Sequence, residues 1–246
     1  MLIQEARERI ASLEQRIESF VREEKRTGGI ERDAKADEYM LYVQFESGIP
    51  NKISLDVRAI ARDLRDALDH AVYASAVAIS GGDPKRTKFL TADTEEGIKD
   101  DIGRGRCRDV HPDIVALMIA EGAHQAGNRT LWALNQFRNQ NTHKAVTLAA
   151  LDSGGLGIQS ANIRYLRWQG MSEWRSTTRC LYFLRFTGDS KFDLQVDPMV
   201  EIRLHESLGL AGEAAGLALL KIAAEVERVV DAIQTETARI LRERGG

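Results

Sequence analysis

The sequence predicts a mainly helical α+β domain in which a small antiparallel β-sheet is inserted into a helical bundle. Apolar residues recur every three or four positions from Ile3 to Val21, which is the spacing of an amphipathic helix. After Lys144 the pattern changes to short apolar and aromatic runs separated by glycine-containing turns, which is typical of strands. We therefore expect one domain over residues 1–246, with a bundle in 1–145 and 206–246 and a β insertion at about 146–205.

The composition is typical of a soluble globular protein. Of the 246 residues, 43% are hydrophobic and 29% are charged, which is enough apolar material for a core. The formal net charge is -3, so any nucleic-acid or membrane surface would have to be local. Cys107 and Cys180 stand far apart, which favours a reduced setting over a disulfide framework. No leader and no long apolar run is present, so we expect a cytoplasmic protein without a membrane span.

Four further helices and an early strand are expected before and after the β insertion. The strand is rich in aromatic and β-branched residues, and the helices have caps or helical spacing of apolar residues. The strand is expected at 38–46. The four helices are expected from a cap at Ser54 to about Ile79, from Pro112 to 119, from Leu131 onward, and at about 213–242.

The second of these helices has two distinct faces. One face is an apolar stripe, and the opposite face is a mixed stripe of Asp66, His70, Tyr73 and Val77. We therefore expect this helix to be central and to be contacted on both sides. The apolar stripe consists of Val57, Ile60, Ala61, Leu64, Leu68, Val72 and Ile79.

The first candidate site is the polar end of the helix that opens at Leu131. It carries Arg138, Asn139 and His143 within a turn and a half. An arginine can offset negative charge on a phosphodiester transition state, and a histidine can transfer its protons, which together suffice for metal-independent RNA cleavage. Positions five apart on an unbroken helix diverge by about 140°, so Arg138 and His143 meet only if the helix ends or distorts. The alternative is a structural helix end whose histidine binds backbone groups.

The second candidate is the set Arg65, Asp66, Asp69 and His70 on the preceding long helix. These residues can form a composite site if they face Asn139 and His143 across the bundle. The alternative is that they make buried hydrogen bonds, as polar residues of central helices commonly do.

The third candidate is an RNA-binding surface in the β insertion. Between Ile163 and Phe186 the chain carries five arginines, two tryptophans and a single acid, Glu173. Interleaved arginines and aromatics can follow a single strand of nucleic acid, but the same pattern also fits a sheet with its aromatics inside and its arginines outside. The candidates are Lys144, Arg164, Arg167, Trp168 and Arg175.

No metal site or cofactor is expected from the sequence. Cys107 and His111 lack two further ligands at a useful spacing, which argues against zinc. Gly154 to Gly157 lies between predicted strands, so it indicates a turn and not a nucleotide loop.

Two stretches resemble a widespread group of uncharacterised bacterial and phage-borne proteins. Leu64 to Ala74, Leu-Arg-Asp-Ala-Leu-Asp-His-Ala-Val-Tyr-Ala, is similar to the group's Leu-Arg-x-Ala-Leu-Asp-His helix. Leu131-Trp132-x-Leu134, leading to His143-Lys144, is similar to its second motif, a leucine-rich helix that closes in a Lys-His-Arg-type sequence. This chain has no lysine just before the histidine.

More distantly, a helical bundle with Arg-polar-x-x-x-His resembles the HEPN superfamily. Many of its members are metal-independent RNases of toxin–antitoxin and antiphage systems, and they typically act as dimers that pair two such motifs. The resemblance implies a HEPN-like bundle, a homodimer, and RNA and an antitoxin or defence-system protein as partners. It also implies that Arg138, Asn139 and His143 form the catalytic set. The competing expectation is a non-catalytic interaction module in which the long helices dimerise.

Overall fold

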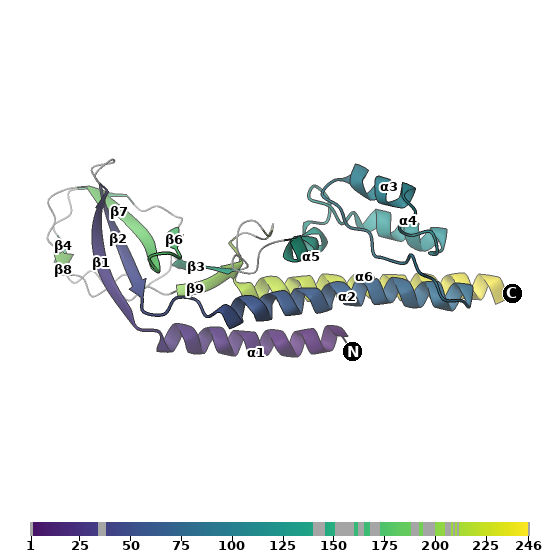
Figure 1. Cartoon of the computed structure of the whole chain (residues 1–246), viewed down its shortest axis with the longest axis horizontal. Coiled ribbons are helices and arrows are strands. Elements are labelled where there is room, and N and C mark those ends of the chain that lie inside the picture. Colours follow the sequence, from purple (N-terminus) through teal and green to yellow (C-terminus); the bar gives the residue numbers. More distant parts are fainter. Residues whose placement is uncertain are drawn as a thin grey trace. The chain divides into compact units, whose positions relative to one another are not determined.

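The computed structural model confirms a mixed α/β protein with six helices and a small antiparallel sheet among the residues it describes (Figure 1). The described residues are 2–33, 38–139, 146–150, 160–161, 165–167, 173–187, 192–193, 200–204, 208, 210 and 212–245.

The contacts within the chain define two compact units, and each is built from separate stretches of sequence. Unit 1 contains residues 1–14, 54–145 and 204–246, and unit 2 contains 15–53 and 146–203. The early strand predicted at 38–46 therefore belongs to the same unit as the later strands. The expected single domain stays a prediction.

Unit 1 is helical, and its long helices carry most of its length. None of the helices in the described part of the chain is long and apolar enough to cross a membrane. The helices are α1 (Leu2–Glu23, of which the first part belongs to this unit), α2 (Asn51–Ser80), α3 (Glu95–Gly103), α4 (Pro112–Glu121), α5 (Arg129–Asn139) and α6 (Ala215–Gly245).

Helices α1, α2 and α6 pack together in unit 1. Arg7 on α1 forms an ion pair with Glu227 on α6. Helices α2 and α6 run next to each other in Figure 1, and the hydroxyls of Ser75 and Thr237 form a buried hydrogen bond of 2.6 Å between them. An ion pair and a buried hydrogen bond thus hold these helices together, in addition to their apolar contacts.

The apolar stripe of α2 is buried as predicted, from Val57 to Val72. The prediction that α2 is contacted on both sides is wrong, because Asp66, His70 and Tyr73 are exposed. The predicted start at Ser54 is also wrong, since α2 begins at Asn51 and Ser54 is buried in its first turn.

Helix α6 buries only some of its apolar residues. Leu219, Ile222 and Val226 are fully buried, whereas Leu217 and Leu220 are 50% and 39% exposed. The helix is apolar over a wide arc in its first turns, so spacing alone could not show which side packs.

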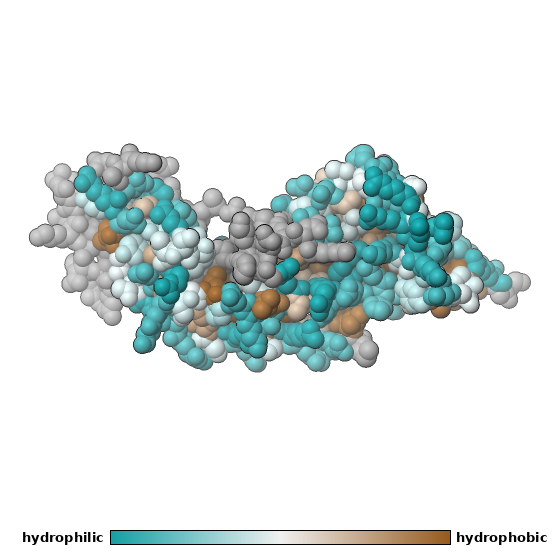
Figure 2. All heavy atoms as spheres, viewed as in Figure 1, coloured by the Kyte–Doolittle hydropathy of each residue, from teal (hydrophilic) through white to brown (hydrophobic). Residues whose placement is uncertain are grey.

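Helices α3 and α4 follow from recognisable end signals. Thr94 caps α3 by accepting a hydrogen bond from the backbone N–H of Gly97, and this helix was absent from the prediction. Pro112 is in the first turn of α4 as expected, and Gly122 ends α4 in the left-handed conformation. The visible surface of α3 and α4 is largely hydrophilic (Figure 2).

Helix α5 is fixed at its start and along one face. Asn128 Oδ1 accepts a hydrogen bond of 3.2 Å from the backbone N–H of Leu131, which satisfies one of the free donors of the first turn. The Nδ2 of Asn128 donates to Glu225 Oε1 on α6 at 2.6 Å. Leu131, Leu134 and Phe137 are buried, as the helical spacing predicted.

Unit 2 is built around an antiparallel sheet with the order β1-β2-β7-β5, in which β6 also pairs with β7. Leu41, Val43 and Phe45 of β2 and Leu181 and Phe183 of β7 are buried. The strands of this sheet are β1 (Arg26–Asp33), β2 (Glu38–Phe45), β5 (Tyr165–Arg167), β6 (Glu173–Arg175) and β7 (Cys180–Thr187). Two further pairs join β3 (Val146–Ala150) to β9 (Val200–Leu204), and β4 (Ser160–Ala161) to β8 (Phe192–Asp193).

Strand β1 was predicted to be the end of the first helix. The sequence Thr27-Gly28-Gly29 is typical of the end of a helix when read on its own. In the structure, however, these three residues all pair with β2. A Cβ at Gly29 would lie 2.4 Å from the ring of Tyr42, so glycine is required where the tyrosine crosses the neighbouring strand. Pairing between strands therefore outweighs the weak strand propensity of glycine.

Candidate functional site

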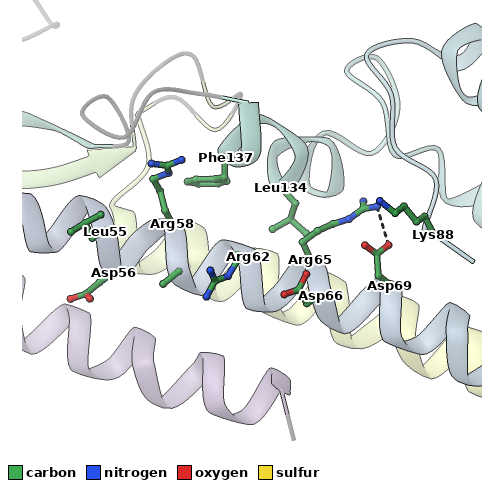
Figure 3. Close-up of a pocket in the computed structure, with 11 residues that line it drawn as sticks. Leu55, Asp56, Arg58, Arg62, Arg65, Asp66, Asp69, Lys88, Leu134 and Phe137 are labelled. Atoms are coloured by element: carbon green, nitrogen blue, oxygen red, sulfur yellow. Dashed lines mark hydrogen bonds and ion pairs between the residues drawn. The ribbon is translucent and has the colours of Figure 1, made fainter.

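A hollow of about 750 Å³ lies between α2 and α5 in unit 1 (Figure 3). This volume is within the range of pockets that hold small ligands. Its lining residues are Leu55, Asp56, Arg58, Ala59, Arg62, Arg65, Asp66 and Asp69 from α2, Lys88 from the segment after it, and Leu134 and Phe137 from α5.

One face of α2 forms the floor of the hollow. Its lining residues recur at intervals of three and four, and such intervals place side chains one above another on a helix. Arg58, Arg62 and Arg65 are the cations of this row. In Figure 3 the side chain of Arg58 extends toward Phe137 on α5.

Arg65 and Asp69 hold the extended segment that follows α2. They form an ion pair of 3.1 Å one turn apart, shown by the dashed line in Figure 3. Arg65 also donates hydrogen bonds to the carbonyl of Phe89 at 2.6 Å and to the hydroxyl of Thr91 at 3.2 Å. The backbone N–H of Phe89 donates to Asp69 Oδ1 at 2.8 Å. Both side chains thus fix the backbone that carries Lys88.

The same segment is fixed to α5 from its other end. Asp93 Oδ1 accepts hydrogen bonds from Trp132 Nε1 at 2.9 Å and from Gln136 Nε2 at 3.1 Å. Residues 87–93 therefore connect the two helices that form the walls of the hollow. This connection holds α5 to α2 within unit 1.

Three cations of the hollow remain available to a ligand. Arg58 and the ammonium group of Lys88 make no hydrogen bond or ion pair with any residue that the structure describes. Arg62 forms only a 3.9 Å pair with Asp63, and its side chain is 72% exposed. Asp56 and Asp66 lie among these cations, and Asp56 points away from Phe137 in Figure 3. With Arg65 and Asp69 paired to each other, the hollow keeps a small excess of positive charge.

The first predicted site begins where α5 ends. Arg138 and Asn139 are the last two residues of α5, directly after Phe137, which lines the hollow. Their side chains lie outside the described part of the structure, as do His143 and Lys144 entirely. The predicted catalytic set therefore stays a prediction, but the helix that leads into it forms one wall of the hollow.

The second predicted set is only partly brought together. Arg65, Asp66 and Asp69 line the hollow, whereas His70 is exposed and is not among the lining residues. The expected buried hydrogen bonds are made by Arg65 and Asp69, which bind the 87–91 backbone, and not by the exposed Asp66 and His70. The side chain of Asn139 and the whole of His143, which the composite site would face, lie outside the described residues, so the composite site stays a prediction.

The third predicted set can be placed at one residue. Arg175 donates to Glu173 at 2.7 Å, and its guanidinium lies 4.2 Å from the centre of the Tyr182 ring. The Tyr182 hydroxyl donates to Glu31 at 2.6 Å, and burial followed by this hydrogen bond raises the pKa of the phenol. Arg175 is thus engaged within the sheet. Arg164 and Trp168 lie outside the described residues, and so does the side chain of Arg167.

Three basic residues of the lining were missed by the sequence interpretation: Arg58, Arg62 and Lys88. The two arginines had a usable signal, since they continue the row of Arg65 one turn at a time toward the start of α2. Lys88 had none, because residues 85–93 show neither helical nor strand periodicity.

Comparisons with known proteins give no family for this chain. No model of a protein family, no curated protein and no solved structure matches it. Among the described residues, no group of three or more His, Cys, Asp or Glu side chains could hold a metal ion.

Proposed function

We propose that this protein is an RNA-binding protein of HEPN-like architecture that cleaves RNA without a metal ion. Arg138 would bind the phosphodiester, Asn139 would orient the reacting groups, and His143 would act as the acid or base. A defence or toxin system is the setting that the resemblance to the HEPN superfamily suggests.

One observation supports this proposal above the others. The helix that ends at Arg138 and Asn139 forms a wall of a hollow whose floor carries Arg58 and Arg62. A cationic surface beside the predicted catalytic residues is what an RNA strand requires, because phosphate contacts supply most of the affinity for nucleic acid. Because the whole chain has a net charge of -3, general basicity of the protein does not explain this local group of arginines.

The test is RNA cleavage by the full chain in the presence of a chelator. Mixed RNAs should be cut with and without the chelator, because the arginine and histidine chemistry needs no metal. His143→Ala should lower the cleavage rate by roughly 10²- to 10⁴-fold, the usual contribution of a general acid or base. Expression of the unsubstituted chain, but not of this variant, should slow bacterial growth.

The matched control is His111→Ala. His111 precedes Pro112 as the N-cap of α4, belongs to none of the candidate sets and does not line the hollow, so its removal should leave the cleavage rate unchanged. Equal rates for His143→Ala and the unsubstituted chain would end the nuclease proposal. Cleavage that disappears with the chelator would contradict its metal-independent chemistry.

A non-catalytic interaction module is the second candidate function. The observation that favours it is the structural use of Arg65 and Asp69, which hold the backbone at Phe89. If the second motif follows the same pattern, its polar residues stabilise a helix end and do no chemistry. In that case none of the variants above would differ in RNA cleavage, while a partner protein would still bind.

A further inference from the structure

We infer that the hollow between α2 and α5 binds phosphate groups of a single RNA strand through Arg58, Arg62 and Lys88. This inference rests on the RNA-binding part of the proposed function and not on the cleavage step. It assigns a subsite to residues that lie outside the Arg138–His143 stretch.

The spacing of the cations fits a strand that crosses α2. Arg58 and Arg62 are one helical turn apart, roughly 6 Å along the axis. Lys88 reaches the same hollow from the extended segment after α2. Two guanidinium groups and an ammonium group from two elements thus line one hollow, and guanidinium groups match phosphate oxygens in pairs.

The hollow is preorganised for such a ligand. Lys88 stands next to Phe89, whose N–H and C=O are both bound by the Arg65–Asp69 pair. The backbone below the ammonium group is therefore fixed before any ligand arrives. Leu134 and Phe137 line the hollow from α5, and both are almost fully buried, so they also belong to the packed interior that holds α5 in place.

Asp66 provides a test in the opposite direction, because it is an acidic residue among the cations of the hollow. Its exposed carboxylate lines the hollow and has no hydrogen bond or ion pair among the described residues. A phosphate bound by Arg62, one turn away, would be repelled by this carboxylate. Removing the negative charge should therefore tighten binding, whereas removing any of the three cations should weaken it.

The experiment measures binding of a fluorescent oligouridine to the full chain by anisotropy over a series of salt concentrations. His143→Ala is present in every sample so that the RNA stays intact. Arg58→Gln, Arg62→Gln and Lys88→Gln should each weaken binding severalfold. Each should also reduce the slope of log K against log salt by roughly 0.7, the value for one phosphate contact on a single strand. Asp66→Asn should bind more tightly than its parent.

Two matched controls come from α3 and the residue after it. Arg104→Gln and Asp100→Asn make the same charge changes at exposed residues that do not line the hollow. Both should bind RNA like the parent, and circular dichroism should show the same folded signal for all variants. Uridine monophosphate and inorganic phosphate serve as competitors. If the site binds an RNA strand, both should displace the labelled RNA far less well than unlabelled oligouridine does. If inorganic phosphate displaces it as well as oligouridine does, the site binds free phosphate and the inference is wrong.

The outcomes separate the subsite from the proposed function. If the three cation variants bind like Arg104→Gln while the unsubstituted chain cuts RNA, the subsite is wrong and the nuclease proposal stands. If binding follows the predicted signs but the unsubstituted chain cuts nothing, the subsite stands and the nuclease proposal fails. Absence of RNA binding in the parent overturns both.

Discussion

Asp66 and Asp69 lie on the same face of α2, but only Asp69 has a structural role. Asp69 accepts hydrogen bonds from Arg65 at 3.1 Å and from the Phe89 N–H at 2.8 Å, while Asp66 has no such partner in the described chain. The sequence groups the two residues in one polar motif, because both lie in Leu64 to His70. Only the segment that returns over α2 distinguishes them, and that segment has no periodicity to predict.

We expect Asp69→Ala to lower the free energy of unfolding by roughly 1–3 kcal/mol, because it leaves a partly buried N–H and a guanidinium without their acceptor. Asp66→Ala, the control on the same helix, should change it by less than about 0.5 kcal/mol. Urea denaturation followed by circular dichroism measures both. Equal losses would show that Asp69 does not hold the 87–91 backbone.

Cys107 should react slowly until the protein unfolds. Its side chain is buried and donates to the carbonyl of Lys88 at 3.2 Å. Burial, followed by the charges of Asp101 and Asp69, raises the pKa of this thiol from 9.0 to about 11. At pH 8 the thiol is protonated, so iodoacetamide labelling mapped by mass spectrometry should be slow in the native protein and fast in urea.

The same pKa shift predicts how stability changes in alkali. The unfolded chain loses the thiol proton near pH 9, whereas the folded chain keeps it up to about pH 11. The contribution of Cys107 to stability is therefore complete below pH 9 and is lost as the pH rises through 11. Cys107→Ser should make unfolding less dependent on pH in this window, and an unchanged dependence would contradict the shift.

The helices with regular apolar spacing could be predicted from the sequence. The elements that depend on contacts with other parts of the chain could not. Helices α1, α2, α4, α5 and α6 follow from apolar spacing and end signals. Strand β1 was missed because Thr27-Gly28-Gly29 has the local character of a helix end, and its pairing with β2 is a contact between strands that local sequence does not show. Helix α3 was missed because a nine-residue helix with one fully buried side chain, Ile98, gives almost no apolar period.

The candidate site was predicted less fully. The sequence singled out Arg65, Asp66 and Asp69 as one polar set on α2, but it indicated neither the hollow nor its other cations. The roles within the set could not be predicted, since they depend on a non-helical segment that binds Arg65 and Asp69.

The connection between α4 and α5 should not tolerate a side chain at Gly127. A Cβ there would lie 2.4 Å from the carbonyl oxygen of Gly122, which accepts hydrogen bonds from the N–H groups of His124 and Asn128. Gly127→Ala should lower the free energy of unfolding by roughly 1–3 kcal/mol, because the backbone must shift to make room. Gly82→Ala, which meets only Ser80 at 3.8 Å, should be nearly neutral in the same urea titration.

For the whole molecule, the resemblance to the HEPN superfamily predicts a dimer in which two Arg138–His143 motifs complete each other. Light scattering should then give twice the 27.4 kDa of one chain. Arg138→Ala and His143→Ala should each be inactive alone, since each removes one half of the chemistry.

Mixing the two inactive variants distinguishes a shared site from two separate ones. If the arginine of one chain acts with the histidine of the other, a mixed dimer retains one intact pair, so RNA cleavage should reappear after the variants are unfolded and refolded together. The control is each variant taken through the same treatment alone. If cleavage stays absent although mixed dimers form, each motif works within its own chain. A single-chain mass at every concentration would contradict the predicted dimer itself, while RNA binding through Arg58, Arg62 and Lys88 would remain expected, because these residues line one hollow within a single chain.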